Sequence, residues 1–258
     1  MTSTTHAASV HGGRVAADVQ RRSYLFLRLS LWSVVLYAGL GLLGFAVVAG
    51  FWPPPAEGLT ATEIAAYFSS HGSGVRIGMV LMVVGAPWYY VWSIAVSKVI
   101  GRIEGQMGPL SMMELLGGFF TAVITAAPGV IWLTAAFRPE SRSAENIQLF
   151  YDLGWLTFDM TFVFSFIQSI AIGIAILIDS RPEPLFPRWV AWLSFLTAAT
   201  YVPLTIMPFV RTGPFAWNGL LNFWAVFVLF FVLIAAVTPT GLRALRRLEH
   251  EDRDVAAS

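Results

Sequence analysis

Two acidic residues lie inside an apolar stretch, bounded by Glu145 and Asp179, that is otherwise typical of a membrane-crossing helix. Asp152 and Asp159 are seven residues apart, and positions seven apart lie within about 20° of each other around an α-helix, so both carboxyl groups share a face with Trp155. A carboxylate inside a bilayer costs about 2.5 kcal/mol or more. We therefore expect this face to point at a bundle interior, a partner or water, where it could coordinate a cation, relay protons or hold a polar ligand.

Other polar side chains are expected at the same level of the membrane. Asn218 and Asn222, in the last apolar segment, are four residues apart and share a helical face. Two arginines and a tyrosine from other segments fall at a similar depth. The sequence thus predicts a polar pocket in the outer half of a helical bundle. Its candidate ligand- or ion-binding residues are Asp159, Asp152, Asn222, Asn218, Arg211, Arg76 and Tyr201.

The two acids also have structural interpretations. Asp152 lies near the outer interface, where pairing with Arg211, Arg76 or Arg138 would explain it. Asp159 lies about 10 Å deeper, from the rise of 1.5 Å per residue. Acids within a membrane are functional hypotheses by default, but they can also be buried partners of amides. Both interpretations of Asp159 stay open on the sequence alone.

The remaining polar groups have local explanations. Asn218 is expected to cap or pack in a first helical turn, and Asn222 to form a hydrogen bond between helices. Glu114 lies in a further apolar segment, but Ser111-x-x-Glu114 is a capping-box pattern. We therefore place Glu114 in a first turn at the inner interface, rather than on a proton path.

Composition limits the class of protein. With 57% hydrophobic and 12% charged residues, the chain is typical of polytopic membrane proteins. A net charge of +1 gives no basic field for nucleic acid. There are no cysteines, and the histidines lie in tails or a loop, so ligands for haem, iron–sulfur or copper centres are missing from the apolar segments. The sequence has no phosphate-binding loop and no protease, hydrolase or prenyl-diphosphate motif. We assign no catalytic residue, metal or cofactor, and an enzyme is not favoured.

The elements that must position these residues form an all-α bundle of six transmembrane helices. Residues 1–23 are expected to form a disordered cytoplasmic tail, and residues 241–258 a second, mixed-charge tail. In the loop after the first span, Thr60-x-x-Glu63 predicts a short amphipathic helix on the membrane surface. The transmembrane domain covers residues 24–240. Its spans are expected at about 24–52, 76–100, 111–137, 145–178, 188–210 and 216–237.

Charge predicts the orientation of the bundle. Of the 16 lysines and arginines, twelve fall on the side of the termini and four on the other side. Because basic residues are enriched in cytoplasmic loops, we expect both termini in the cytoplasm. A 3+3 inverted repeat is compatible with this topology and is left open, supported only by the similarity of residues 108–120 to residues 213–225.

Several short motifs carry a resemblance. They are the three prolines from Pro53, RIGMVL at 76–81, FRPE at 137–140, DLGW at 152–155, FPRWVAW at 186–192 and RTGPFAWNGLLNFW at 211–224. With these motifs, most of the chain after the N-terminal tail resembles uncharacterised polytopic inner-membrane proteins of actinobacteria and some proteobacteria. The resemblance implies a bacterial inner-membrane protein and places Asp152, Arg211 and Asn218 in shared motifs. It implies no activity, and Asp159 falls outside the motifs.

Three functions fit these observations. The first is a bundle whose pocket binds or transports a small solute, a cation or a proton. The second is a non-catalytic membrane subunit or scaffold of a larger complex. The third is an enzyme that acts on a lipophilic substrate with Asp159 as general acid or base. The expected partners are the lipid bilayer, a small-molecule or ion ligand, and a membrane protein or a second copy of the chain.

Overall fold

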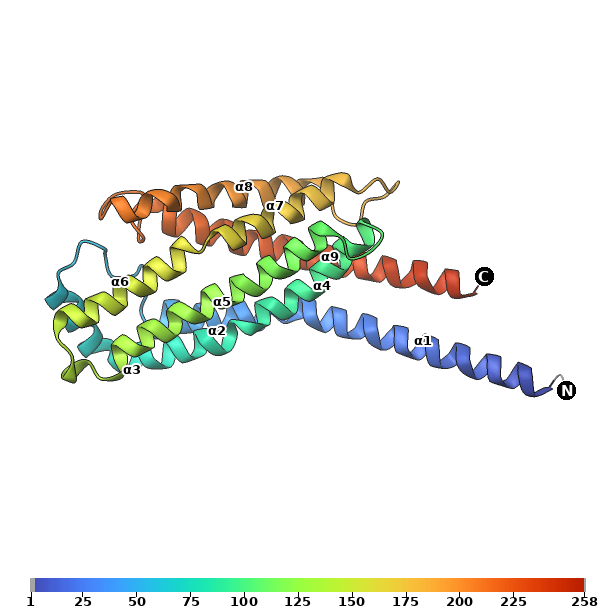
Figure 1. The fold of residues 1–258 in the computed structure, drawn as a ribbon, viewed down its shortest axis with the longest axis horizontal. Helices are drawn as coiled ribbons and strands as arrows, with labels where there is room; N and C mark the ends of the chain where they lie inside the picture. Colours follow the sequence, from blue (N-terminus) through green and yellow to red (C-terminus); the bar gives the residue numbers. More distant parts are fainter. Residues whose placement is uncertain (1–2, 258) are drawn as a thin grey trace.

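The computed structural model describes residues 3–257, with side chains from Asp18 to Val255. Within that range the chain is helical and forms no strand. The helices run back and forth along one axis (Figure 1). Four short elements, two π-helices and two 3₁₀-helices, interrupt or join them: η1 (Leu43–Val48), η2 (Pro139–Ser141), η3 (Val202–Phe209) and η4 (Leu220–Ala225). The α-helices are α1 (Ser3–Trp32), α2 (Val34–Leu42), α3 (Ala61–Gly85), α4 (Pro87–Ile103), α5 (Pro109–Phe137), α6 (Ala144–Met160), α7 (Val163–Ile178), α8 (Arg188–Tyr201) and α9 (Val226–Ala257).

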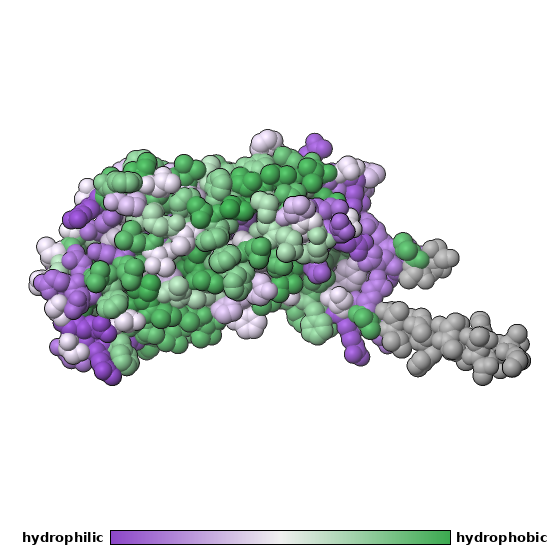
Figure 2. Space-filling view, viewed as in Figure 1, coloured by the Kyte–Doolittle hydropathy of each residue, from purple (hydrophilic) through white to green (hydrophobic). Residues whose placement is uncertain are grey.

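Six helical segments of the described chain are long and apolar enough to cross a membrane, as the sequence predicts. Hydrophobic residues cover the length of the bundle between two more hydrophilic ends (Figure 2). Both ends of the chain lie at the right of Figure 1, which we call the terminal end; the opposite end is the far end. The segments are Asp18–Val48, Ala61–Ile103, Pro109–Phe137, Ala144–Ile178, Arg188–Phe209 and Leu220–Val255.

Helix α5 is central to the packing. It contacts α3, α4, α6 and α7. A methyl group on Gly117 would lie 2.6 Å from the Cβ of Gln168 on α7, and one on Gly118 would overlap Ser93 on α4. Small residues at these positions therefore let neighbouring helices approach closely, which favours association in lipid.

A second close approach joins the first two spans. Gly44 on η1 faces Gly78 on α3, and a methyl group on either glycine would overlap the backbone oxygen of the other. The surroundings of Gly78 also include Ala49, whose Cβ would lie 2.8 Å away from the added methyl. These two helices meet backbone to backbone.

The elements differ from the expected ones at several places. Thr60 and Glu63 form the predicted capping box, but the helix that they start is α3, which continues to Gly85 without a break. The separate surface helix is therefore a wrong prediction, because no residue between Glu63 and Gly85 stops the helix. The fourth span is broken into α6 and α7, and the fifth changes to 3₁₀ geometry at Val202, one residue before Pro203.

Both predicted tails fall in helices. Helix α1 begins at Ser3, within residues 1–23, which were expected to be disordered. Residues 1–2 of that segment lie outside the described residues. Helix α9 continues past residue 240 to Ala257, and Ala244, Leu245 and Leu248 are buried against the bundle. A periodic apolar stripe thus extends the last span beyond the expected membrane boundary.

The buried side chains form two hydrophobic clusters. One, towards the terminal end, includes Tyr37, Trp92 and Phe186. The other, towards the far end, includes Phe45, Trp155 and Phe223. The candidate site lies between them.

We expect Gly78→Ala to lower the melting temperature of the purified protein in detergent. Alanine is the better helix former by about 1 kcal/mol, but the added methyl overlaps the Gly44 backbone and Ala49, and overpacking costs up to about 3 kcal/mol. A net loss near 2 kcal/mol corresponds to a decrease of about 4 °C or more. The matched control is Gly39→Ala on α2, where nothing lies within 4 Å of the new methyl; equal effects at the two positions would contradict the packing described.

Candidate functional site

Asp159 lies in the last turn of α6, near the middle of the fourth span. It is 6% exposed, and its Oδ2 atom is buried without a hydrogen-bond partner among the described residues. No lysine or arginine within the described part of the chain forms an ion pair with it. The carboxyl group thus has no internal partner that offsets a negative charge.

The helix breaks directly beside this acid. Thr161 leaves the helical conformation at φ −91° and ψ 10°, and the Phe162 N–H donates to the Asp159 carbonyl at 3.2 Å, closing a tighter turn. Helix α7 then begins at Val163. Asp152 and Asp159 both lie on α6, so they keep the two-turn spacing expected for one helix. After the break, the side chains of α7 no longer continue the helical faces of α6.

A cavity of about 80 Å³ adjoins Asp159. This volume has room for a few water molecules or a small organic cation. Hydroxyl groups and aromatic rings line it, and most of the rings belong to one of the two hydrophobic clusters or to residues packed against them. A smaller cavity of about 40 Å³ shares Tyr37, Thr125 and Phe158 with it. The hydroxyl residues are Tyr37, Thr121, Thr125, Ser165 and Tyr201, and the rings include Phe158, Phe162, Phe227, Phe230 and Phe231.

The hydroxyl groups of two tyrosines that line this cavity differ in their hydrogen bonds. The Tyr37 hydroxyl lies 3.2 Å from Thr125 Oγ1. The Tyr201 hydroxyl is buried and has no partner among the side chains described. Asp159 and Tyr201 therefore present an unsatisfied carboxyl and an unsatisfied hydroxyl to one hollow.

Irregular backbone surrounds the cavity. Besides the break between α6 and α7, helix α8 ends at Tyr201 and continues as the 3₁₀-helix η3, while the π-helix η4 precedes Val226 and Phe227 on α9. In membrane proteins, non-helical backbone at bilayer depth occurs where it is buried in protein or lines a cavity. Single π-turns are also frequent at functional sites.

Glu114 is the main polar residue that sequence reasoning placed wrongly. It is completely buried, and its Oε1 accepts hydrogen bonds from Ser93 Oγ at 2.9 Å and Gln168 Nε2 at 3.1 Å. Its Oε2 has no partner among the described residues. Glu114 therefore belongs to a polar network between α4, α5 and α7 and does not cap α5.

The acid that caps α5 is Glu104. It accepts hydrogen bonds from the backbone N–H groups of Leu110 at 3.0 Å and Ser111 at 2.8 Å. Burial opposes the charged form, but these bonds and the one from the Ser111 hydroxyl hold the pKa of Glu104 below its ordinary value. A carboxylate from the preceding loop thus takes the role that the local pattern assigned to Glu114.

The Glu114 network reaches the cavity through hydroxyl groups. Gln168 Oε1 accepts from the Tyr89 hydroxyl at 2.9 Å and from Thr121 Oγ1 at 3.4 Å. Thr121 Oγ1 also lies 2.8 Å from Ser165 Oγ, and both Thr121 and Ser165 line the cavity. Hydrogen bonds therefore connect the wall of the Asp159 cavity with Glu114.

Most of the other predicted site residues lie elsewhere. Asp152 is half-buried and interacts electrostatically with Arg211, which is exposed. Arg76 is also exposed, and its guanidinium donates to Ser73 Oγ at 3.2 Å. None of these three lines the cavity. The ion pair predicted for Asp152 is thus a longer-range interaction with Arg211.

The two asparagines are also outside the cavity lining. Asn218 is half-buried in the turn before η4. Asn222 is buried, its Nδ2 donates to the Phe215 carbonyl, and its Oδ1 has no partner among residues 18–255. Of the seven predicted residues, the structure brings Asp159 and Tyr201 together.

Glu57 is a further acid near the far end. It accepts a hydrogen bond from the Trp217 N–H at 3.1 Å. Burial raises the pKa of Glu57 above its ordinary value, although this bond opposes the shift. Asp152 adds repulsion and Arg211 attraction, so Glu57 belongs with them to a charged group at the far end. Glu57 also interacts electrostatically with Asp159, as one negative charge with another.

Sequence reasoning missed the hydroxyl residues of the cavity other than Tyr201. Thr121 and Thr125 are four residues apart, a spacing that places two hydroxyl groups on one helical face. Ser165 is followed by Gln168 and Ser169, three and four residues on, a spacing that places three polar side chains on one helical face and could have marked this residue. Within the described residues, no group of three histidine, cysteine or acidic side chains could hold a metal ion.

The chain matches no protein-family model, no curated protein and no solved structure.

We expect Gln168→Leu to destabilise the protein, because the side chain of Gln168 is the shared partner of Glu114, Tyr89 and Thr121. Leaving buried polar groups without partners costs about 1–3 kcal/mol for each group. Thermal unfolding in detergent measures the change, with Gln106→Leu in the exposed loop before α5 as the matched control. Equal stability of Gln168→Leu and wild type would show that the network contributes nothing.

Proposed function

We propose that this chain is a multi-pass membrane protein that binds a small cation, a proton or a protonated amine, in the cavity at Asp159 and moves it across the bilayer. One observation carries the proposal: a carboxyl group near the middle of a membrane span faces a cavity and has no partner in the described chain.

The energetics of the carboxyl group support a cation. An unpaired carboxylate in apolar surroundings is costly, and no basic side chain of residues 18–255 pairs with this one. Its partner therefore comes from outside the protein, as a proton or as a larger cation. The pocket selects positive charge for the same reason.

The walls of the cavity favour an organic cation over a bare metal ion. The aromatic rings of Phe158, Phe227 and Phe230 line it, and the faces of aromatic rings attract ammonium groups. Hard metal ions instead require six or more oxygen ligands, and one carboxyl with a few hydroxyl groups is a poor match. A protonated amine would pair with Asp159 and donate to the Tyr201 hydroxyl.

The helix breaks support movement as well as binding. Transporters commonly place their sites near the bilayer midplane at discontinuous helices. Here the fourth, fifth and sixth spans all lose α-helical geometry at residues next to the cavity. Such segments can change conformation at a lower cost than a continuous helix.

We also propose that the protein resides in a bacterial inner membrane with both termini in the cytoplasm. The twelve basic residues assigned to the terminal side support this orientation. The cation would then enter or leave through the far end on the outer side.

Cysteine labelling tests the orientation without background, since the chain has no cysteine. Ser141→Cys at the far end should react with a membrane-impermeant maleimide in intact cells. Ser180→Cys, in the exposed loop after α7, should react only after the cells are permeabilised. The opposite pattern would reverse the proposed orientation.

Flux measurements test the site. In proteoliposomes with an internal pH dye and an imposed membrane potential, wild type should change the internal pH faster than protein-free liposomes, with or without methylammonium as the probe. Asp159→Asn should lower this rate about tenfold or more, because it removes a charge-assisted contact.

The matched control is Asp152→Asn, the same substitution on the same helix, outside the cavity. It should retain most of the wild-type rate. A wild-type rate equal to that of empty liposomes in both conditions, or an equal loss in the two variants, would contradict the proposal.

A further inference from the structure

A second, larger recess lies at the terminal end, between α9 and the loop that joins α7 to α8. Its volume is about 480 Å³. Three arginines line it, Arg188 from the first turn of α8 and Arg243 and Arg247 from α9, and no acidic residue does. Pro184, Leu185 and Phe186 supply an apolar side. We call it the arginine recess.

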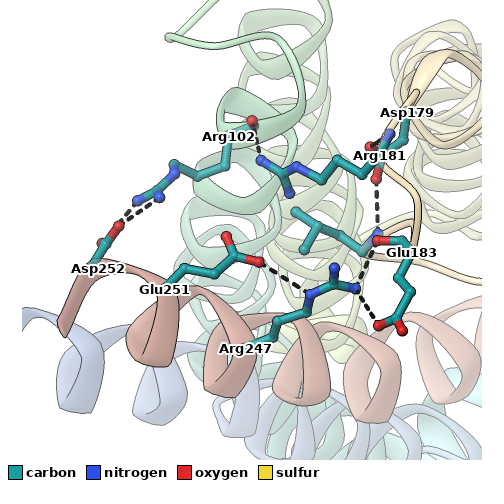
Figure 3. Close-up of polar contacts among 8 residues, drawn as sticks. Arg102, Asp179, Arg181, Glu183, Arg247, Glu251 and Asp252 are labelled. Atoms are coloured by element: carbon teal, nitrogen blue, oxygen red, sulfur yellow. Dashed lines mark hydrogen bonds and ion pairs between the residues drawn. The ribbon is translucent and has the colours of Figure 1, made fainter. Parts of the chain in front are cut away.

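The wall formed by the loop is held in place by polar contacts (Figure 3). Asp179 accepts hydrogen bonds from the backbone N–H groups of Leu185 at 2.8 Å and Arg181 at 3.3 Å. The Arg181 guanidinium donates to the Arg102 carbonyl at 2.7 Å. Leu185 and Phe186, which belong to this loop, are themselves largely buried. The recess is therefore preformed and does not need to fold around a ligand.

The charge of the recess is positive. Arg247 donates to the Glu183 carbonyl at 2.7 Å and pairs with Glu251 at 3.1 Å and Glu183 at 3.3 Å, as Figure 3 shows. Arg188 and Arg243 are exposed and form no ion pair with any acid of the described chain. Two guanidinium groups thus remain available to a ligand, and guanidinium groups match phosphate oxygens in geometry and charge.

A second basic recess, between α1 and α9, is a weaker candidate. Its lining includes Asp18 and Glu249. Glu249 pairs with Arg28 and with Arg253, so much of its positive charge is already neutralised.

The arginine recess lies at the depth of lipid headgroups. Trp189 and Trp192, on the first turns of α8, are 55% and 65% exposed. Exposed tryptophans at span ends are typical of the membrane interface. An anionic group in the recess would therefore lie at the bilayer surface. An apolar group attached to it would contact the loop between α7 and α8, including Phe186.

We propose that the arginine recess binds the phosphate group of an anionic phospholipid in the leaflet at the terminal end. Arg188 and Arg243 contact the phosphate oxygens, and the apolar side of the recess contacts the glycerol and the upper acyl chain. Basic pockets at the cytoplasmic ends of membrane helices bind anionic headgroups by this chemistry. This proposal is independent of the cavity at Asp159.

Native mass spectrometry of the full chain tests it, with phosphatidylglycerol and phosphatidylcholine titrated in detergent. Wild type should retain phosphatidylglycerol more strongly than phosphatidylcholine. Arg243→Ala should weaken phosphatidylglycerol binding about tenfold, the usual effect of losing a hydrogen bond to a charged group. The matched control is Arg246→Ala, which removes an equal charge from an exposed position of α9 outside the recess and should change the affinity by less than about twofold, because exposed charges are screened.

The other outcomes overturn the proposal. Equal retention of the two lipids, or equal losses in Arg243→Ala and Arg246→Ala, would show that the recess does not select an anionic lipid. Competition with inorganic phosphate tests a soluble ligand. If phosphate displaces phosphatidylglycerol from wild type at equal concentration, the recess is a site for free phosphate. The melting temperatures of both variants should equal that of wild type, so that a difference in lipid retention reflects binding and not unfolding.

Discussion

A polar group inside a bilayer has to find its partner within the protein, because lipid tails offer none. Most of the buried polar side chains described here meet this requirement across helices. Trp92 Nε1 donates to Thr238 Oγ1 at 3.0 Å, Ser97 to the Ser111 carbonyl at 2.7 Å, and Trp132 Nε1 to the Tyr151 carbonyl at 3.1 Å. The bundle depends on such bonds, and the carboxyl group of Asp159 is an exception that lies on a cavity.

The two ends of the bundle are closed by different means. At the far end, the carbonyl of Pro55 accepts from the Tyr151 hydroxyl at 2.7 Å and from Trp217 Nε1 at 3.1 Å, and Trp155 stacks on Trp217 with their ring centroids 5.7 Å apart. At the terminal end, ion pairs such as that of Arg102 with Asp252, at 2.6 Å, tie α4 to α9. The cavity thus lies between the packed aromatic side chains of the far end and the ion pairs of the terminal end. Movement of a cation to the far end would require the aromatic side chains there to separate.

Local sequence signals predicted the spans well, because the length of an apolar run depends on neighbouring residues alone. They predicted the hydrogen-bond partners of the polar side chains poorly. The pattern of a hydroxyl residue followed three positions later by glutamate is a true capping box at Thr60, whereas at Ser111 the same pattern is coincidental. What decides the role of Glu114 is Gln168, a residue 54 positions away on another helix. Asp159 could be singled out because an acid is rare in such a run, but its cavity depends on hydroxyl groups from other helices and on a helix break beside it that no proline or glycine marks.

Our proposal for the cavity requires that the partner of Asp159 comes from outside the protein. Dicyclohexylcarbodiimide, which modifies protonated carboxyl groups in apolar surroundings, tests this claim most directly when the modified residues of the membrane-embedded protein are mapped by mass spectrometry. We expect Asp159 to be modified, and protection by methylammonium would identify an amine as the cation. If Asp159 stays unmodified while the wild-type protein remains folded, its carboxyl group is sealed or already paired within the bundle, which contradicts an external partner.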